Sequence, residues 1–474
     1  MLLTAQYVIA AMLFFLKQGK PTVPISSLSE WPLVTIQLPI YNEKFVVIRL
    51  IDSICSLDYP KDRLTIQVLD DSTDETTQIA LASIFSKRAT GINIELIHRL
   101  NRNGYKAGSL EHGFRLSTAE YFVVFDADFV PPTHFLKQAI PQFSINKNLG
   151  ALQTGWMNKN SELSLITMAQ DIIWDINLVV EQTIRERYKL LKYSNGSAVI
   201  SRRQCIEDAG GWHSDTLTED LDLSYRSQIK GWEFLYNFEI ESSSEVPISI
   251  RAFKQQQFRW TAGTIQVLRK LGGKTWRSSL PIAKKCDAFM HMGAYFAYPL
   301  LLLFTLVFSP ISIANAIHFP STILLVITFV SGLFLLYITS QFRIHPNWER
   351  RILYFPIFTL LITGMVVNNS IAIFAGLLHK KIPFMRTPKI NTGNIGSIPQ
   401  SYSPQMDWII LVELIIVIIS IVWITDAIHR LPEVIPILSF LALSVGYVCL
   451  VSIAEKWTGV LNKTVALLVQ RKSL

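Results

Sequence analysis

The chain has 474 residues, of which half are hydrophobic and only 17% are charged, and its mean hydropathy is +0.31. This composition excludes a wholly water-soluble protein, because part of such a chain must lie in lipid. The net charge of +8 fits a nucleic-acid-binding protein or a membrane enzyme with basic flanks and an anionic substrate. No zinc-ligand spacing or basic helix supports the first alternative, so we expect no nucleic-acid partner.

An apolar run at residues 1–16 opens the chain and is followed by Lys17 and Lys20. No small-residue cleavage site follows it, which favours an anchor helix over a removed signal peptide. The run is short for a span, which needs about 20 residues. We predict an N-terminal membrane helix within residues 1–20.

Residues 30–287 have the composition of a soluble α/β domain. Short β-branched runs alternate with helical patterns, which is typical of a mostly parallel sheet covered on both faces. The expected strands are 33–39, 65–70, 92–97, 121–126 and 149–154, with helices at 44–56, 74–87, 106–117 and 132–142. Ligands of such sheets bind beyond the carboxyl ends of the strands. Polar residues that follow a strand are therefore the first candidates for a site.

Two acidic pairs follow predicted strands. Asp126 and Asp128 flank one small residue, so both carboxylates can reach one divalent ion, which in turn neutralises a diphosphate. Asp70 and Asp71 end another strand and suit the hydroxyl groups of a nucleoside. Strand-end aspartates also cap turns and helices, and this alternative stays open for both pairs.

A lysine and an acidic pair lie at predicted helix starts. Lys106 suits an anionic nucleotide there, because the helix dipole otherwise disfavours a cation at that end. Glu219 and Asp220 by themselves are typical of a solvated first turn. Their context, not their pattern, makes Asp220 a candidate base.

A further candidate is the helix that carries QQQFRW. Gln256, Arg259 and Trp260 share one face of it. A guanidinium clamps phosphate oxygens and an indole stacks on a sugar ring. The alternative is an interfacial helix with its tryptophan at the headgroup level, and both can hold together.

Residues 288–474 form a membrane region. Apolar runs long enough to span occur at 289–309, 321–341, 407–427 and 434–454. The loop 310–320 has no lysine or arginine, whereas 342–351 has three arginines, so the positive-inside rule places the first loop outside and the second in the cytoplasm.

The apolar stretch 353–378 has basic residues on both sides. A single crossing would leave one basic cluster outside. We therefore predict an interfacial or re-entrant segment, with an ordinary span as the alternative.

The motifs follow one another as IQLPIYNE, QVLDDSTDET, NRNGYKAGSL, FDADFVPP, CIEDAGGW, DTLTEDLDLSYR, KGWEF and QQQFRW. As an ordered set they are far more specific than any one of them. On these motifs the chain resembles family 2 glycosyltransferases of the cellulose synthase and hyaluronan synthase type, most closely the mannan and glucomannan synthase branch. The resemblance covers residues 33–275. MRTPKI at 385–390 is similar to the gating loop of such synthases and implies a cytoplasmic loop at 379–392.

The resemblance implies a GT-A fold, an inverting single displacement and Mg²⁺ or Mn²⁺ as cofactor. Asp220 would be the base, and Asp126 and Asp128 would hold the metal. The donor nucleotide sugar, a UDP- or GDP-hexose, would contact Tyr41, Glu43, Asp70, Asp71, Lys106, Asp126 and Arg259. The acceptor would contact Trp260, Gln256, Asn195, Gly196, Ser197 and Glu219. The segment 192–198 reads KYSNGSA and departs from the Phe-Asn-Gly-Thr-Ala-Gly-like run of the branch, which puts the acceptor in doubt.

We therefore expect an integral membrane enzyme with a cytoplasmic catalytic domain, in the inner or plasma membrane if the host is bacterial. It would transfer mannose from GDP-mannose, or glucose from UDP-glucose, to a growing β-linked polysaccharide such as β-1,4 mannan, glucomannan or glucan. One alternative is a single transfer to a lipid acceptor, as in ceramide glucosyltransferase-like relatives. Another is a transporter with a nucleotide-binding domain. Against this alternative, the predicted spans lack the charged pairs that line ion paths, apart from Glu413 and Asp426 near span ends.

Overall fold

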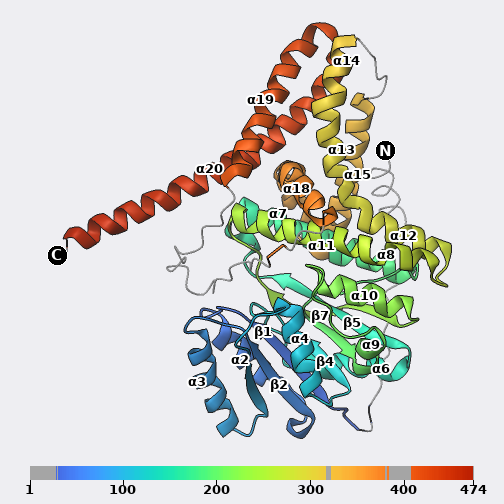
Figure 1. Cartoon of the computed structure of the whole chain (residues 1–474), viewed down its shortest axis with the longest axis vertical. Coiled ribbons are helices and arrows are strands. Elements are labelled where there is room, and N and C mark those ends of the chain that lie inside the picture. Colours follow the sequence, from blue (N-terminus) through green and yellow to red (C-terminus); the bar gives the residue numbers. More distant parts are fainter. Residues whose placement is uncertain (1–27, 29, 316–321, 379–381, 384–406, 473–474) are drawn as a thin grey trace.

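The computed structural model describes residues 28, 30–315, 322–378, 382–383 and 407–472. An α/β domain forms one end of the molecule and a set of long apolar helices forms the other (Figure 1). The predicted N-terminal helix at 1–20 and nearly all of the predicted loop at 379–392 lie outside the described residues.

The α/β domain is built on one seven-stranded sheet with the order β3-β2-β1-β4-β6-β5-β7. Only β6 runs antiparallel to its neighbours, so the predicted mixed, mostly parallel sheet is confirmed. The strands are β1 (Val34–Ile40), β2 (Leu64–Asp70), β3 (Ile94–His98), β4 (Tyr121–Val124), β5 (Leu149–Asn158), β6 (Val199–Arg202) and β7 (Glu233–Ser244). The sequence patterns predicted the first five and missed β6 and β7.

Helices cover both faces of the sheet, as the side-chain alternation of β4 shows. Tyr121 and Val123 enter one hydrophobic core, whereas Phe122 and Val124 enter the other. The predicted helix at 132–142 is split, because Pro141 cannot donate the hydrogen bond that would continue it. The helices are α2 (Val47–Cys55), α3 (Thr76–Ala89), α4 (Tyr105–Leu116), α5 (Phe135–Ala139), α6 (Gln142–Ile145), α7 (Leu165–Asp175), α8 (Gln182–Arg187), α9 (Arg203–Asp208) and α10 (Glu219–Ile229).

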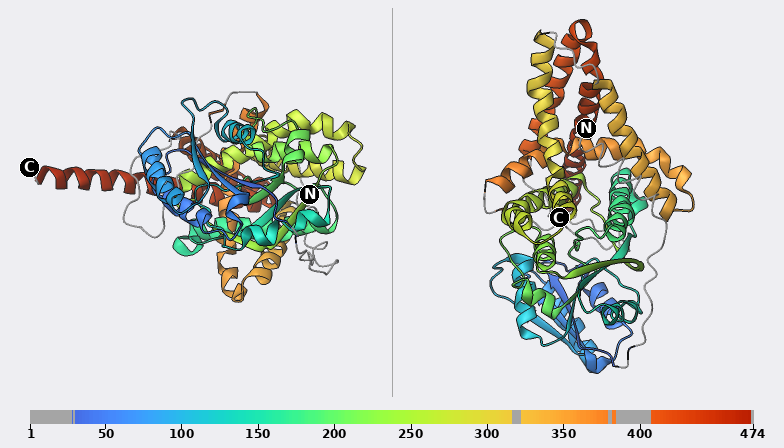
Figure 2. Two further views of the ribbon diagram at one scale, coloured as in Figure 1. Left: turned by 90° about the horizontal axis from the view of Figure 1, so that it is seen from below. Right: turned by 90° about the vertical axis from the view of Figure 1, so that its right-hand side faces the viewer.

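The 28-residue helix α11 (Ile250–Arg277) lies between the sheet domain and the apolar helices (Figures 1 and 2). One side of it packs against α10 and the other against α18 and α20. It is therefore one of the elements through which the sheet domain and the apolar helices meet; α7 is another, since it packs against α15 and α17.

Five helical stretches among the described residues are long and apolar enough to cross a membrane. The first is continuous from residue 282 to 315 and contains α12 (Ile282–Gly293), α13 (Ala297–Leu303) and α14 (Ser309–Asn315). The others are Val326–Ile344 in α15 (Thr322–Ile344), Trp348–Leu377 across α16 to α18, Trp408–Arg430 in α19 (Asp407–Arg430) and Pro432–Trp457, which ends within α20 (Ile435–Lys472). The predicted spans at 289–309, 321–341, 407–427 and 434–454 each overlap one of these stretches.

The stretch 353–378 is broken in the middle. It contains α17 (Phe355–Gly364) and α18 (Val366–Leu377), which meet at Met365, and α16 (Trp348–Arg351) precedes it. α18 packs along α11, on the side of α11 that faces away from the sheet (Figure 1). An interfacial position for this stretch stays a prediction, and this packing is compatible with it.

Candidate active site

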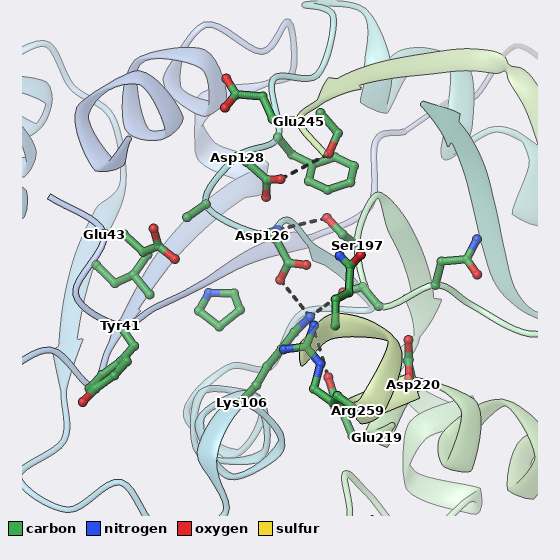
Figure 3. Close-up of a pocket in the computed structure, with 18 of the residues that line it drawn as sticks. Tyr41, Glu43, Lys106, Asp126, Asp128, Ser197, Glu219, Asp220, Glu245 and Arg259 are labelled. Carbon is green, nitrogen blue, oxygen red and sulfur yellow. Dashed lines mark hydrogen bonds and ion pairs between the residues drawn. The ribbon is translucent and has the colours of Figure 1, made fainter. Parts of the chain in front are cut away.

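One cavity of about 180 Å³ lies beyond the carboxyl ends of the strands, between the sheet and α11. Every predicted site residue except Asp70 lines it, although these residues extend along the chain from Tyr41 to Trp260. Figure 3 shows Tyr41 and Glu43 at one side of the cavity, Asp126 and Lys106 near its centre, and Asp220 at the other side. Parallel strands bring their ends to a common edge, which is why acids distant in sequence meet here.

Asp126 and Lys106 form the centre of the cavity. The ammonium of Lys106 lies 2.8 Å from Asp126 Oδ1 and 3.6 Å from Glu219 Oε1, and it donates a hydrogen bond of 2.8 Å to the carbonyl of Gly196. Burial alone would lower the pKa of Lys106, but Asp126 and Glu219 outweigh it and raise this pKa well above its usual value. Lys106 is therefore a permanent cation in the middle of the site.

Residues 195–198 form the loop that leads into β6, and this loop lies between the end of β4 and the start of α10. The Asp126 backbone N–H donates to Ser197 Oγ (3.0 Å), and the Ala198 N–H donates to the carbonyl of Val124 (2.8 Å). Gly196 has a φ of +77°, and a Cβ there would lie 2.8 Å from Asp220 Oδ2. Only glycine allows this backbone to pass so close to the Asp220 carboxylate.

Asp220 lies in the first turn of α10, with its carboxylate toward the cavity (Figure 3). Burial, and then the neighbouring charge of Glu219, raise the pKa of Asp220 to about 7, against the opposing effect of Lys106. A carboxyl group with such a pKa takes up and releases protons at neutral pH, as a general base must.

Asp128 points away from Lys106, toward β7. Its Oδ2 accepts a hydrogen bond of 3.3 Å from Ser244, and the next residue, Glu245, lies 2.7 Å from Arg49. Glu245 was not predicted from the sequence, because β7, which ends just before it, was not recognised.

Asp70 and Asp71 differ in position. Asp70 is fully buried outside the cavity lining, and it holds the strand-end turn through Ser72, Thr77 and His98. Asp71 lines the cavity, and both its oxygens bind the guanidinium of Arg99. The geometry thus gives Asp70 a structural place, whereas Asp71 keeps access to a ligand.

α11 forms the roof of the cavity with Gln256, Arg259 and Trp260. Burial lowers the pKa of Arg259, with Glu219 and Asp126 acting in the opposite direction. Because an arginine starts from a pKa above 12, it remains charged at physiological pH. The roof thus adds a second fixed cation.

Trp260 belongs to a row of rings that the sequence analysis did not predict. Its ring centroid lies 5.3 Å from that of Trp174, which lies 4.8 Å from Trp156, which lies 5.3 Å from Phe129. All four rings line the cavity. Trp156 follows the predicted strand 149–154, and this position at a strand end is the sequence signal that could have found it, although the strand-end rule selected polar residues alone.

Arg102 is another lining residue that was missed. Its guanidinium carbon lies 3.4 Å from the ring centroid of Tyr41. Such stacking marks this face of Tyr41 as a surface for flat groups.

The carboxylates of Asp126 and Asp128 both line the cavity and offer the hard oxygen ligands that divalent ions prefer. The Lys106 ammonium, 2.8 Å from Asp126, already occupies a cation's place beside that carboxylate. Two other groups of described residues contain three possible ligands, but a basic side chain binds each: Arg351 pairs with Asp171 and Asp175, and Lys270 with Asp215 and Asp222.

The chain is similar to plant proteins named as glucomannan 4-beta-mannosyltransferases. It is 41% identical over 247 residues to glucomannan 4-beta-mannosyltransferase 2 of Arabidopsis thaliana, and the aligned region covers 51% of this chain and 46% of the relative. It is 34% identical over 316 residues to glucomannan 4-beta-mannosyltransferase 7 of the same plant, and this region covers 63% of this chain and 57% of the relative. The chain thus spans about half the length of the curated relatives it matches.

Among solved structures, a mannosyltransferase of Pyrobaculum calidifontis in complex with GDP-Man and Mn²⁺ has a similar fold. The TM-score is 0.55 at 19% identity, covering 78% of this chain and 96% of that one. The model of the family described as glycosyl transferase family group 2 matches residues 121–367, which include Asp126, Asp220 and Arg259. This match takes in more than half of the sequence, and the chain belongs to that family.

Proposed function

We propose that the chain is a membrane-bound, inverting hexosyltransferase that extends a β-linked polysaccharide from GDP-mannose or UDP-glucose, with β-1,4 mannan or glucomannan as the first candidates. The observation that carries the proposal is the single cavity that holds Asp220, Arg259 and the Asp126–Lys106 pair together. The name of the plant relatives supports mannose as the donor sugar and a 4-β linkage.

In the proposed reaction, an acceptor hydroxyl attacks the anomeric carbon of the donor. Asp220 takes the hydroxyl proton, a new glycosidic C–O bond forms, and the bond from the anomeric carbon to the diphosphate breaks. Because attack and departure occur on opposite faces of that carbon, the anomeric configuration inverts. The raised pKa of Asp220 supports its role as the base.

The leaving diphosphate carries the charge that develops in the transition state. Arg259 in the roof and Lys106 on the floor are cations fixed on either side of the region where it would lie. Asp126 and Asp128 would hold Mg²⁺ or Mn²⁺, which supplies further charge neutralisation when bound. Tyr41, Glu43 and Asp71 line the part of the cavity proposed for the nucleoside.

The acceptor would enter on the side of Trp260. Its ring, half-buried in the roof, offers an apolar face for a sugar, and Gln256, Glu219 and residues 195–197 offer polar groups next to it. A glycolipid acceptor would reach the same side, because the membrane helices lie above α11 (Figure 2).

For the domains we propose a membrane helix at 1–20, a catalytic domain at 30–287 on the cytoplasmic side, and a membrane region at 288–474 with a gating loop at 379–392. The cytoplasmic side is supported by Arg351, the last residue of the basic loop 342–351, which pairs with Asp171 of the catalytic domain.

The test uses the purified full chain with a panel of UDP- and GDP-hexoses, Mg²⁺ or Mn²⁺, and analysis of product length and linkage. We expect polymer from GDP-mannose, from UDP-glucose, or from both together. Products one sugar longer than the acceptor would contradict chain extension, and label in a chloroform-soluble product would identify a lipid acceptor. No transfer from any donor would overturn the proposal.

A further inference from the structure

The first turn of α11 is bound by a membrane helix. Glu455 of α20 accepts hydrogen bonds from the backbone N–H groups of Ile250 (2.9 Å) and Arg251 (3.3 Å). The first N–H groups of a helix have no partner within the helix, and a carboxylate there also interacts favourably with the positive end of the helix dipole. Glu455 therefore fixes the start of α11 against α20.

The next turn of α11 carries a buried ion pair to a second membrane helix. The Lys254 ammonium lies 2.7 Å and 2.8 Å from the two oxygens of Glu413 in α19, and 2.8 Å from Ser452 Oγ in α20. Lys254 is 4% exposed and Glu413 is fully buried. A lone charge at such a site is strongly disfavoured, so each partner holds the other in place.

The far part of α11 is also fixed. Arg269 donates 2.8 Å and 3.1 Å hydrogen bonds to the carbonyls of Gly376 and Leu377, at the end of α18. Between the two fixed regions lie Arg259 and Trp260, five and six residues after Lys254, which is about 8 Å along the helix axis. Their height above the sheet therefore depends on where Lys254 is held.

We propose that Lys254, Glu413 and Glu455 are positioning residues that set the height and rotation of α11, and with it the place of Arg259 and Trp260 over the reacting groups. The membrane helices α19 and α20 thereby form part of the catalytic apparatus without touching substrate. This inference rests on the proposed function, because it assigns Arg259 to the diphosphate and Trp260 to the acceptor.

Glu413→Gln and Lys254→Met in the full chain test this inference. We expect the kcat of sugar transfer to fall at least tenfold and the acceptor KM to rise. Nucleoside monophosphate binding should stay within twofold, since the nucleoside side of the cavity belongs to β1, β2 and α4. In the wild type we expect a nucleoside diphosphate to bind more tightly than the monophosphate. In these variants the difference should shrink toward the difference measured for Arg259→Met. A loss of folded protein would not change this difference.

Two variants complete the test. The charge-swapped double variant Lys254→Glu with Glu413→Lys restores the pair, and we expect it to recover much of the lost kcat. Asp426→Asn removes an exposed ion pair with Arg430 on the same helix α19 and should change nothing.

The inference is overturned if Glu413→Gln keeps the wild-type kcat and acceptor KM, or if all activities and both nucleotide affinities fall in the same proportion. If the wild-type chain transfers sugar and the variants do so equally well, the inference is overturned and the proposed function stands. A wild-type chain that transfers no sugar from any donor overturns the proposed function and the inference with it.

Discussion

Asp220 is the residue on which the proposed chemistry depends most directly. Asp220→Asn keeps the shape of the side chain but cannot accept a proton. We expect kcat to fall by about 10²–10⁴-fold, the usual contribution of a general base, while the Kd for nucleoside diphosphate changes little. Asp215→Asn is the matched control, because Asp215 lies outside the cavity lining and pairs with Lys270. Retained transfer by Asp220→Asn would remove Asp220 from this role.

The environment of Asp220 also sets the pH dependence of the reaction. Burial and Glu219 raise the pKa of Asp220 to about 7, so the carboxylate form, which accepts the proton, predominates above that pH. The kcat/KM should therefore rise with pH and level off above about 7. Because Glu219→Gln removes a neighbouring negative charge, the pKa of Asp220 should fall and the rising limb should move to lower pH.

The matched control for this pH profile is Glu207→Gln, which alters an exposed acid on α9. Its profile should superimpose on that of the wild type. If the rising part of the kcat/KM profile lies at the same pH in Glu219→Gln as in the wild type, a group other than Asp220 controls the rate.

At the scale of the element, α11 sets the position of the turn that carries Asp220. Gly263 packs against this turn: a Cβ there would lie 2.6 Å from Thr218 Cγ2 and 3.0 Å from the Thr218 backbone nitrogen. Gln266, one turn further on, accepts a 2.9 Å hydrogen bond from the Leu217 N–H. Gly263→Ala should displace the turn and lower kcat at least tenfold.

Gly273→Ala is a control on the same helix, since nothing lies within 4 Å of a Cβ there. This change should leave kcat unaltered and stabilise α11 by up to about 1 kcal/mol, from helix propensity. Enzyme kinetics and thermal unfolding of the two variants give the comparison. Equal kcat values would show that the close approach of Gly263 to Thr218 has no role in catalysis.

At the scale of the whole molecule, the two ends of the apolar helices should lie on opposite sides of a membrane. The loop between α15 and α16 lies against α7, since His345 and Arg351 pair with Asp175 and Asp171. The connection from α19 to α20, which follows Arg430, lies at the end of the apolar helices far from the α/β domain (Figure 1). In sealed vesicles, with the exposed Cys286 replaced by serine, single cysteines can be labelled with an impermeant maleimide. Asp62→Cys and Asn347→Cys should react from one side, and Arg430→Cys from the other. Reaction of all three from one side would contradict a crossing.

The sequence by itself determined the features that depend on neighbouring residues. The apolar runs that became α15, α19 and α20 are long enough to be recognised alone. The strand-end acids Asp71 and Asp126 follow runs whose period marks them as strands. The family resemblance added Asp220 and Arg259, which no local pattern distinguishes from a solvated turn and an interfacial helix.

Only the tertiary structure decided which of these residues meet. Asp70 and Asp71 are adjacent in the chain, yet one turns into the fold and the other into the cavity, because Asp70 is the last residue of β2 and Asp71 the first residue after it. β6 is too short for a periodic pattern to predict, and its place depends on pairing with β4 and β5. The ion pair of Lys254 and Glu413 joins residues 159 positions apart. Such a contact is stabilised by burial in the folded chain, and neither residue carries a local sign of the other.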